Sequence, residues 1–209
     1  NLSKNFDYDK YNLIIVDKNK VNQEFEANIG RLSEKAHVVY RNNGLSLTYS
    51  EWIKYNRLFN RSSVEDIKTH QIFVAREWKR LLGNTQVDRA IDFGGYAPFW
   101  SYMMAFSKAK RKIIYQHNDM QAEFDKVVEG RYVHKKNLTT IFEFYKYFDY
   151  IASVGKLTME QNKKNLSKFV SNDKFVYVPN LLDKEYLFDH RNNPQLSIQE
   201  FLGEEKLII

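Results

Sequence analysis

Residues 110–119 read Lys-Arg-Lys-Ile-Ile-Tyr-Gln-His-Asn-Asp, and this stretch decides the fold class of the chain. A basic start leads into a short apolar strand, which ends in His117 and the polar pair Asn118–Asp119. A helical spacing of apolar residues begins directly afterwards, at Met120. Ligands of open α/β sheets bind beyond the carboxyl ends of the strands, so these polar residues are candidates for a functional site.

The rest of the chain alternates strand-like and helical patterns. Several strand-like runs are continuously apolar, which is typical of strands covered on both faces. Strands are predicted at 12–16, 37–41, 89–93, 112–116, 150–154, 174–178 and 206–209. Helices are predicted at about 21–33, 48–59, 64–82, 97–108, 119–147 and 156–169. Strands separated by helices predict an α/β fold with a doubly wound parallel sheet of the Rossmann-like type.

Composition excludes several classes of protein. The chain has 209 residues, of which 43% are hydrophobic and 15% aromatic, and it contains no cysteine. Disulfides and thiolate metal sites are therefore excluded, and no run approaches the roughly 20 apolar residues of a membrane span. His37, His70 and His190 lack the spacing of a metal site. No Gly-x-Ser-x-Gly elbow and no Walker-type phosphate loop is present.

The charge pattern concerns the partners of the chain. The net charge is +6, with Lys and Arg scattered among acids rather than gathered into runs. This scatter argues against a nucleic-acid partner. It leaves open a plain composition bias or an attraction to anionic lipid or a phosphate-bearing substrate.

The two ends indicate a fragment of a longer protein. Residues 1–10 are typical of a helix end that leads into a strand, and 204–209 begin a strand with nothing after it. The polar segment 189–195 contains a proline and is typical of a linker. We therefore expect one domain over 1–183, followed over 184–209 by a linker and the first strand of an absent domain. The residues after 183 are too few to bury a core of their own.

Four segments carry a resemblance to a known family. They are Phe6–Asn12, Asp92-Phe93-Gly94-Gly95-Tyr96, Tyr115-Gln116-His117-Asn118-Asp119 and Val178-Pro179-Asn180-Leu181-Leu182-Asp183. The third is similar to a strand-end His-Asp turn, and the fourth to the Val-Pro-Asn-Gly-Val-Asp entry into a second domain. Together they resemble the N-terminal, acceptor-side half of the family-4 glycosyltransferases of the GT-B type, as found in bacterial cell-wall and teichoic-acid synthesis. Leu181 stands where the family has a glycine.

The resemblance implies a retaining transferase that moves a sugar from a nucleotide-sugar to a cell-envelope polymer or lipid-linked acceptor. It implies no metal and no other cofactor, and a cytoplasmic location. The first strand and helix would precede Asn1. A donor-binding domain would follow Ile209 and hold the diphosphate, so the fragment alone would be inactive. The alternatives are a glycerol-phosphate transferase of similar two-domain architecture and a non-catalytic Rossmann-like accessory or binding domain.

The resemblance gives His117 the catalytic role, hydrogen-bonding the donor sugar or diphosphate. The alternative for His117 is a strand-end histidine bonded to nearby backbone. The substrate-binding candidates are Asp92, Gly94, Gly95, Asn118, Asp119 and Asn180. The double glycine permits positive φ and close approach of a ligand, or forms a plain turn. Asp119 could equally cap the helix that follows it.

A basic and aromatic segment, 121–148, follows the strand-end turn. Its cationic group comprises Arg131, His134, Lys135 and Lys136, and its aromatic group Phe142, Phe144, Tyr145, Tyr147 and Phe148. Basic residues beside aromatic ones suit an anionic lipid-linked acceptor or contact with the inner face of the cell membrane. The alternative is a helix–turn–helix whose aromatic side chains pack on the sheet while its cations stay solvated.

Overall fold

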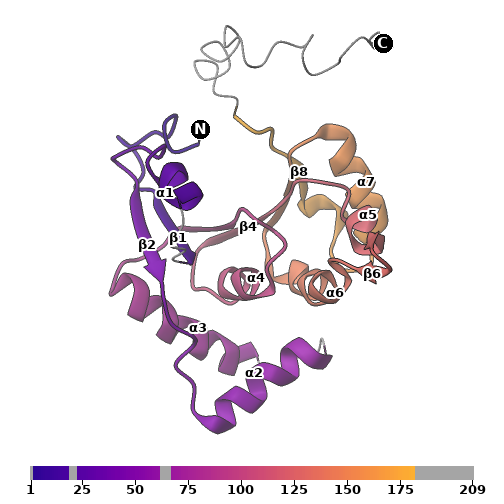
Figure 1. Cartoon of the computed structure of the whole chain (residues 1–209), viewed down its shortest axis with the longest axis horizontal. Helices are drawn as coiled ribbons and strands as arrows, with labels where there is room; N and C mark the ends of the chain where they lie inside the picture. The colour runs from indigo at the N-terminus through magenta and orange to yellow at the C-terminus, as the bar shows by residue number, and fades with distance from the viewer. Residues whose placement is uncertain (1, 19–22, 62–66, 182–209) are drawn as a thin grey trace, which may run out of the picture. The chain divides into compact units, whose positions relative to one another are not determined.

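The computed structural model describes residues 2–18, 23–61 and 67–181 (Figure 1). The chain divides into two compact units. The first comprises Asn1–Ile15, Lys20–His37 and Asn180–Ile209, and the second comprises Val16–Asn19 and Val38–Pro179. The strand predicted at 206–209 and the linker predicted within 184–209 lie outside the described residues.

The N-terminal part of the chain contains a small sheet. Strand β1 (Ile14–Lys18) pairs with β2 (His37–Arg41), and helix α1 (Gln23–Ile29) lies between them in sequence. Ser3 organises the turns before β1: its carbonyl accepts from the Tyr8 hydroxyl at 2.8 Å, and its Oγ accepts from the Ser33 amide at 3.1 Å. The N-terminal turns are therefore fixed to the segment that follows α1.

The second unit is built on a four-stranded parallel sheet in the order β3-β4-β7-β8. These strands are β3 (Arg89–Asp92), β4 (Arg111–Gln116), β7 (Tyr150–Ser153) and β8 (Phe175–Tyr177). The predicted parallel α/β sheet of the Rossmann-like type is confirmed. Each strand pairs with the next strand of this sheet along the chain, so right-handed crossovers bring the connecting helices to the same face. Ile114, Ile151 and Phe175 are buried on that face.

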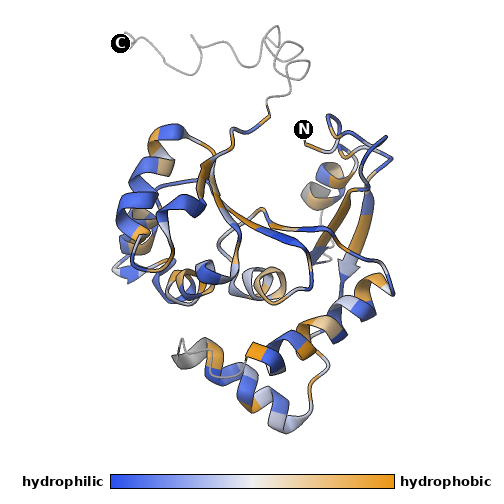
Figure 2. Ribbon diagram, turned by 180° about the vertical axis from the view of Figure 1, so that it is seen from behind, coloured by the Kyte–Doolittle hydropathy of each residue, from blue (hydrophilic) through white to orange (hydrophobic). Residues whose placement is uncertain are grey.

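Helices α4 (Pro98–Ala105), α6 (Lys135–Phe144) and α7 (Lys156–Leu166) cover the buried face, with the short helix η1 (Tyr145–Tyr147). Both views show α4 and α6 side by side against the sheet (Figures 1 and 2). Helix α2 (Tyr49–Arg61) contributes Leu58 to the core, and α3 (Ile67–Leu82) packs on α4, where the Trp78 indole donates to the Met103 carbonyl at 3.2 Å. The core thus lies between the sheet and its helices.

The long helix predicted over 119–147 is wrong. The structure has α5 (Met120–Asp125), then a hairpin of β5 (Val127–Val128) and β6 (Arg131–Tyr132), and only then α6. The two turn residues have positive φ, 49° at Glu129 and 74° at Gly130, as a type I′ turn requires. Two β-branched residues before a glycine turn favour a hairpin, and this local preference ends the helix. The other predicted strands and helices of the described residues are confirmed within a few residues at each end.

Aromatic side chains of 142–148 form part of the core. Phe142, Phe144, Tyr145 and Phe148 are almost completely buried, as the alternative interpretation of this segment expected. Tyr145 also joins a buried polar network under the strand ends. Its Oη accepts from Gln116 Nε2 at 3.0 Å, and Gln116 Oε1 accepts from the Ser153 hydroxyl at 2.9 Å. Burial raises the pKa of Tyr145 far above its ordinary value, so the hydroxyl stays protonated.

Replacing Tyr145 with Phe should test this network. The change removes the acceptor of the buried Gln116 N–H group, so the free energy of unfolding should fall by about 1–3 kcal/mol in urea titration. Tyr150→Phe is the matched control, since that residue is 40% exposed. It should change stability by less than about 0.5 kcal/mol. Equal effects of the two substitutions would show that the network contributes nothing specific.

Candidate functional site

A buried carboxylate organises the carboxyl end of β3. Asp92 is 4% exposed, and its Oδ1 accepts from the Gly95 amide at 3.0 Å while its Oδ2 accepts from the Ser101 hydroxyl of α4 at 2.5 Å. Burial raises the pKa of the Asp92 carboxyl, and the hydrogen bonds from Ser101 and Gly95 oppose that rise. Asp92, predicted to contact substrate, therefore ties the strand end to the helix behind it.

The two glycines after Asp92 have different environments. Gly95 is buried with φ +70°, and a Cβ there would lie 2.2 Å from the Tyr115 carbonyl oxygen of β4. The β3 turn therefore approaches β4 more closely than any side chain would allow. Gly94 is exposed, and the nearest neighbour of a Cβ there would be Asp92 Oδ1 at 3.9 Å. Of the predicted pair, Gly95 is fixed by packing, and Gly94 presents open backbone at the strand end.

His117 connects the ends of β3 and β4. Its Nε2 lies 2.6 Å from the Phe93 carbonyl oxygen. A carbonyl only accepts, so Nε2 carries the hydrogen, and in the neutral form of imidazole the other ring nitrogen, Nδ1, is then an acceptor. No described residue bonds to Nδ1. The partly exposed ring contacts Phe93, with centroids 5.1 Å apart, and Tyr115, at 6.1 Å. The backbone bond expected as the alternative is present, and it leaves one ring nitrogen available.

Asn118 and Asp119 shape the turn after His117. Asp119 caps α5, since its Oδ1 accepts from the amides of Gln121 at 2.9 Å and Ala122 at 3.1 Å. The exposed Asn118 side chain donates to the Tyr96 hydroxyl at 3.0 Å, which joins the β4 turn to the β3 turn. The capping role expected for Asp119 is therefore confirmed.

Sequence reasoning missed Asn162, which holds this turn from α7. Its Oδ1 accepts from the Met120 amide at 2.8 Å, and its Nδ2 donates to the Asn118 carbonyl at 2.9 Å. The side chain is fully buried. The signal in the sequence was a polar residue on the apolar side of a predicted helix, which has to find a partner when buried.

Glu123 and His134 were also missed as neighbours of the strand ends. Glu123 Oε2 lies 3.5 Å from His134 Nε2, and the His134 ring lies 5.2 Å from the Tyr96 ring. Glu123 Oε1 is 3.5 Å from Asn118 Nδ2. Their spacing in sequence gives no signal, because the hairpin brings His134 back to α5. Asn180 is exposed and belongs to the first unit, whereas the other candidates belong to the second.

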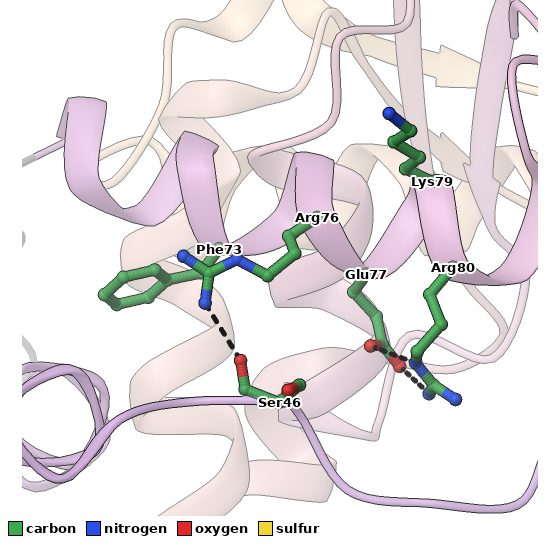
Figure 3. A pocket seen from close by; sticks show the side chains of 6 residues that line it. All are labelled: Ser46, Phe73, Arg76, Glu77, Lys79 and Arg80. Atoms are coloured by element: carbon green, nitrogen blue, oxygen red, sulfur yellow. Dashed lines mark hydrogen bonds and ion pairs between the residues drawn. The ribbon is translucent and has the colours of Figure 1, made fainter.

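Cavities of the second unit include one beside the strand-end turn and one along α3. One, of about 620 Å³, adjoins the strand-end turn and is lined by Asp119, Leu157, Thr158, Glu160, Gln161 and Lys164. The other, of about 310 Å³, lies along α3 and is lined by Ser46, Phe73, Arg76, Glu77, Lys79 and Arg80 (Figure 3). Charged side chains that line the cavity along α3 bond to other residues of the chain. Arg80 pairs with the buried Glu77 at 2.5 Å, and Arg76 donates to the Ser46 carbonyl at 3.0 Å.

No group of three His, Asp or Glu side chains that could hold a metal ion occurs within 2–18, 23–61 and 67–181. No protein-family model matches this chain, and no curated protein matches it. The site is therefore defined by its own geometry: a carboxylate-anchored glycine turn, a bridging histidine and a capped helix at the ends of two adjacent parallel strands.

The glycine pair offers a matched test of this geometry. Gly95→Ala places a Cβ against the Tyr115 carbonyl and requires positive φ of an alanine, so stability should fall by more than about 2 kcal/mol. Gly94→Ala meets neither restriction and should cost less than about 1 kcal/mol. Chemical unfolding of both variants measures the difference. Equal stability of the two proteins would contradict the close approach of the β3 turn to β4.

Proposed function

We propose that this chain is the acceptor-side domain of a retaining glycosyltransferase. In this proposal a sugar moves from a nucleotide-sugar to a cell-envelope polymer or lipid-linked acceptor. The observation that carries the proposal is His117, which donates its Nε2–H to the Phe93 carbonyl and keeps Nδ1 as an acceptor at the carboxyl end of a parallel strand. The resemblance of the strand-end segments to family-4 glycosyltransferases supplies the reaction class.

The acceptor nitrogen suits a sugar hydroxyl. A hydroxyl of the transferred sugar donates to Nδ1, and this bond fixes the orientation of the sugar ring beside the incoming acceptor. The departing phosphate oxygen takes the proton of the acceptor hydroxyl, so no side-chain base is required at this end of the sheet. The diphosphate is neutralised by the donor-binding half that follows this domain in the proposal.

The surroundings of His117 support a positioning task. Its ring is held by Phe93, and Phe93 lies between Asp92 and Gly94 in the anchored turn. A rigid, preorganised contact loses little entropy when substrate binds, and catalysis depends on such positioning. Gly94 adds an exposed backbone without a side chain, which a sugar or phosphate can approach.

Two other functions can be distinguished from this one by the substrates that the protein turns over. A glycerol-phosphate transferase would use CDP-glycerol in place of a UDP-sugar. A binding or accessory domain would turn over neither substrate. The observation that favours such a domain is that Asp92 and Asp119 form hydrogen bonds within the chain. Turnover of the intact gene product with both nucleotide classes distinguishes the three.

His117→Ala in the intact protein should lower turnover about ten- to a hundred-fold. The variant loses one hydrogen bond to a polarised partner, and this loss raises the activation free energy by about 1.5–3 kcal/mol. The melting temperature should change little, because the partly exposed ring fills little core volume. His70→Ala is the matched control: His70 is buried with Nδ1 3.1 Å from the Tyr102 hydroxyl, so this variant should lose stability and keep its specific activity when folded.

Two results would contradict the proposal. One is a His117→Ala protein that melts well below the wild type yet keeps full specific activity. The other is a product whose anomeric configuration, read by NMR, is inverted relative to the donor sugar.

A further inference from the structure

Phe93 and Tyr115 present aromatic rings beside His117. Asp92 is buried on the face of the sheet that the helices cover, so alternation along the chain places Phe93 on the opposite face. The centroid of the Phe93 ring lies 5.0 Å from that of Tyr115 and 5.1 Å from that of His117. Phe93 is 50% exposed. The three rings therefore form one contiguous aromatic surface, and part of it is open to a ligand.

The turns that follow β3 and β4 are joined at two points. At the first, His117 Nε2 donates to the Phe93 carbonyl, and at the second, Asn118 Nδ2 donates to the Tyr96 hydroxyl at 3.0 Å. Residues 93 and 96 are separated by at most about 11 Å of chain. Between them lies Gly94, which is exposed and has no side chain. One ligand of monosaccharide size can therefore reach both junctions.

The two junctions leave hydrogen-bonding groups unused. Tyr96 Oη accepts from Asn118, and no described residue accepts the hydrogen of this hydroxyl. Because the carboxylate of Glu123 only accepts, the Asn118 atom 3.5 Å from it is the amide nitrogen. Asn118 Oδ1 then has no donor among residues 2–18, 23–61 and 67–181. Together with Nδ1 of His117, the turns offer two acceptors and one donor.

This set of groups suits the hydroxyls of an uncharged sugar. A hydroxyl donates, accepts and rotates to suit its partner, so sugar hydroxyls can bond to all three groups. A phosphate only accepts, and here it would face two acceptors. The neighbouring Glu123 carboxylate also engages Lys126 at 3.7 Å and His134 at 3.5 Å. The C–H groups of a pyranose ring can pack on the exposed Phe93 ring, whose face is weakly negative.

We propose that the ends of β3 and β4 form a subsite for an uncharged pyranose. The Phe93 ring contacts the C–H groups of the pyranose, and His117 Nδ1, Asn118 Oδ1 and the Tyr96 hydroxyl bind its hydroxyls. This inference rests on the proposed function, because it takes the pyranose to be the transferred sugar. It makes Phe93 a specificity-determining residue, places the diphosphate away from His117 and excludes uronic acids as the transferred sugar.

Glycosides without a nucleotide test the subsite directly. The ¹⁵N-labelled chain is titrated with the methyl glycosides of glucose, galactose and N-acetylglucosamine. Methyl glucuronide, inorganic phosphate and uridine are titrated separately at matched ionic strength. At least one uncharged glycoside should shift the amides of Gly94, Tyr96 and Asn118. The glucuronide, phosphate and uridine should leave these amides unmoved.

Paired variants separate the ring from the hydroxyl. Phe93→Leu keeps an apolar side chain but removes the ring, and should weaken glycoside binding about two- to tenfold. Tyr96→Phe removes one hydrogen bond to the sugar and should weaken binding about two- to tenfold. The matched controls are Tyr150→Leu and Tyr150→Phe, at a 40% exposed residue that begins β7. These should bind like the wild type, and thermal melting shows that each variant is folded.

Turnover by the intact protein separates this inference from the proposed function. UDP-glucose should be used in preference to UDP-glucuronate, and Phe93→Leu should lower kcat/KM for the sugar donor about two- to tenfold while Tyr150→Leu should not. Sugar transfer that Phe93→Leu leaves unchanged sinks the subsite and leaves the proposed function standing. Turnover of CDP-glycerol alone sinks the proposed function, whereas glycoside binding is measured without any turnover.

The subsite is wrong on any of four results. The first is that no uncharged glycoside shifts the amides of the two turns. The second is that glucuronide or phosphate shifts them as strongly. The third is that Phe93→Leu and Tyr150→Leu bind glycoside equally well. The fourth is that uridine moves these amides in place of the glycosides, which makes the aromatic surface a site for a nucleobase.

Discussion

The strand-end site depends on one buried carboxylate. Asp92 accepts hydrogen bonds from the Gly95 amide and the Ser101 hydroxyl, and so fixes the β3 turn between α4 and β4. A buried carboxyl group needs hydrogen-bond partners in place of water, and the Gly95 amide and the Ser101 hydroxyl are such partners. Gly95 completes the arrangement, because only a residue without a side chain can face the Tyr115 carbonyl at this distance.

The position of His117 is a consequence of this turn. Fixing Asp92 and Gly95 also fixes the Phe93 carbonyl between them, and that carbonyl decides which ring nitrogen of His117 carries the hydrogen. Asn162 holds the next turn from α7, and Asp119 caps α5. Hydrogen bonds to neighbouring helices thus hold two adjacent strand ends, while Gly94, the His117 ring and Asn118 remain at least partly exposed. A site that positions a ligand requires exposed groups that are held in place by such supporting hydrogen bonds.

The parallel sheet could be predicted from the sequence because short strand-like apolar runs alternate along the chain with helical patterns. The run Ile113–Tyr115 and the polar residues after it are local features, and the capping of a helix by Asp119 is local as well. The partners of Asp92, the tautomer of His117 and the role of Asn162 are not local, because each depends on a contact with another strand or helix. The hairpin was missed for a different reason. The apolar residues from Met120 to Val128 fit a helical spacing, and that spacing outweighed the turn signal of Glu129–Gly130.

Amide chemical-shift mapping tests the central claim, that the ends of β3 and β4 bind the transferred sugar, most directly. The ¹⁵N-labelled chain is titrated with UDP-glucose and with UDP-N-acetylglucosamine, in the wild type and in His117→Ala. We expect shifts centred on Gly94, His117 and Asn118, weaker in the variant, with the amides of the α3 cavity around Arg76 unmoved. Shifts that gather around Arg76, or that are unchanged by the loss of the His117 ring, would contradict this claim.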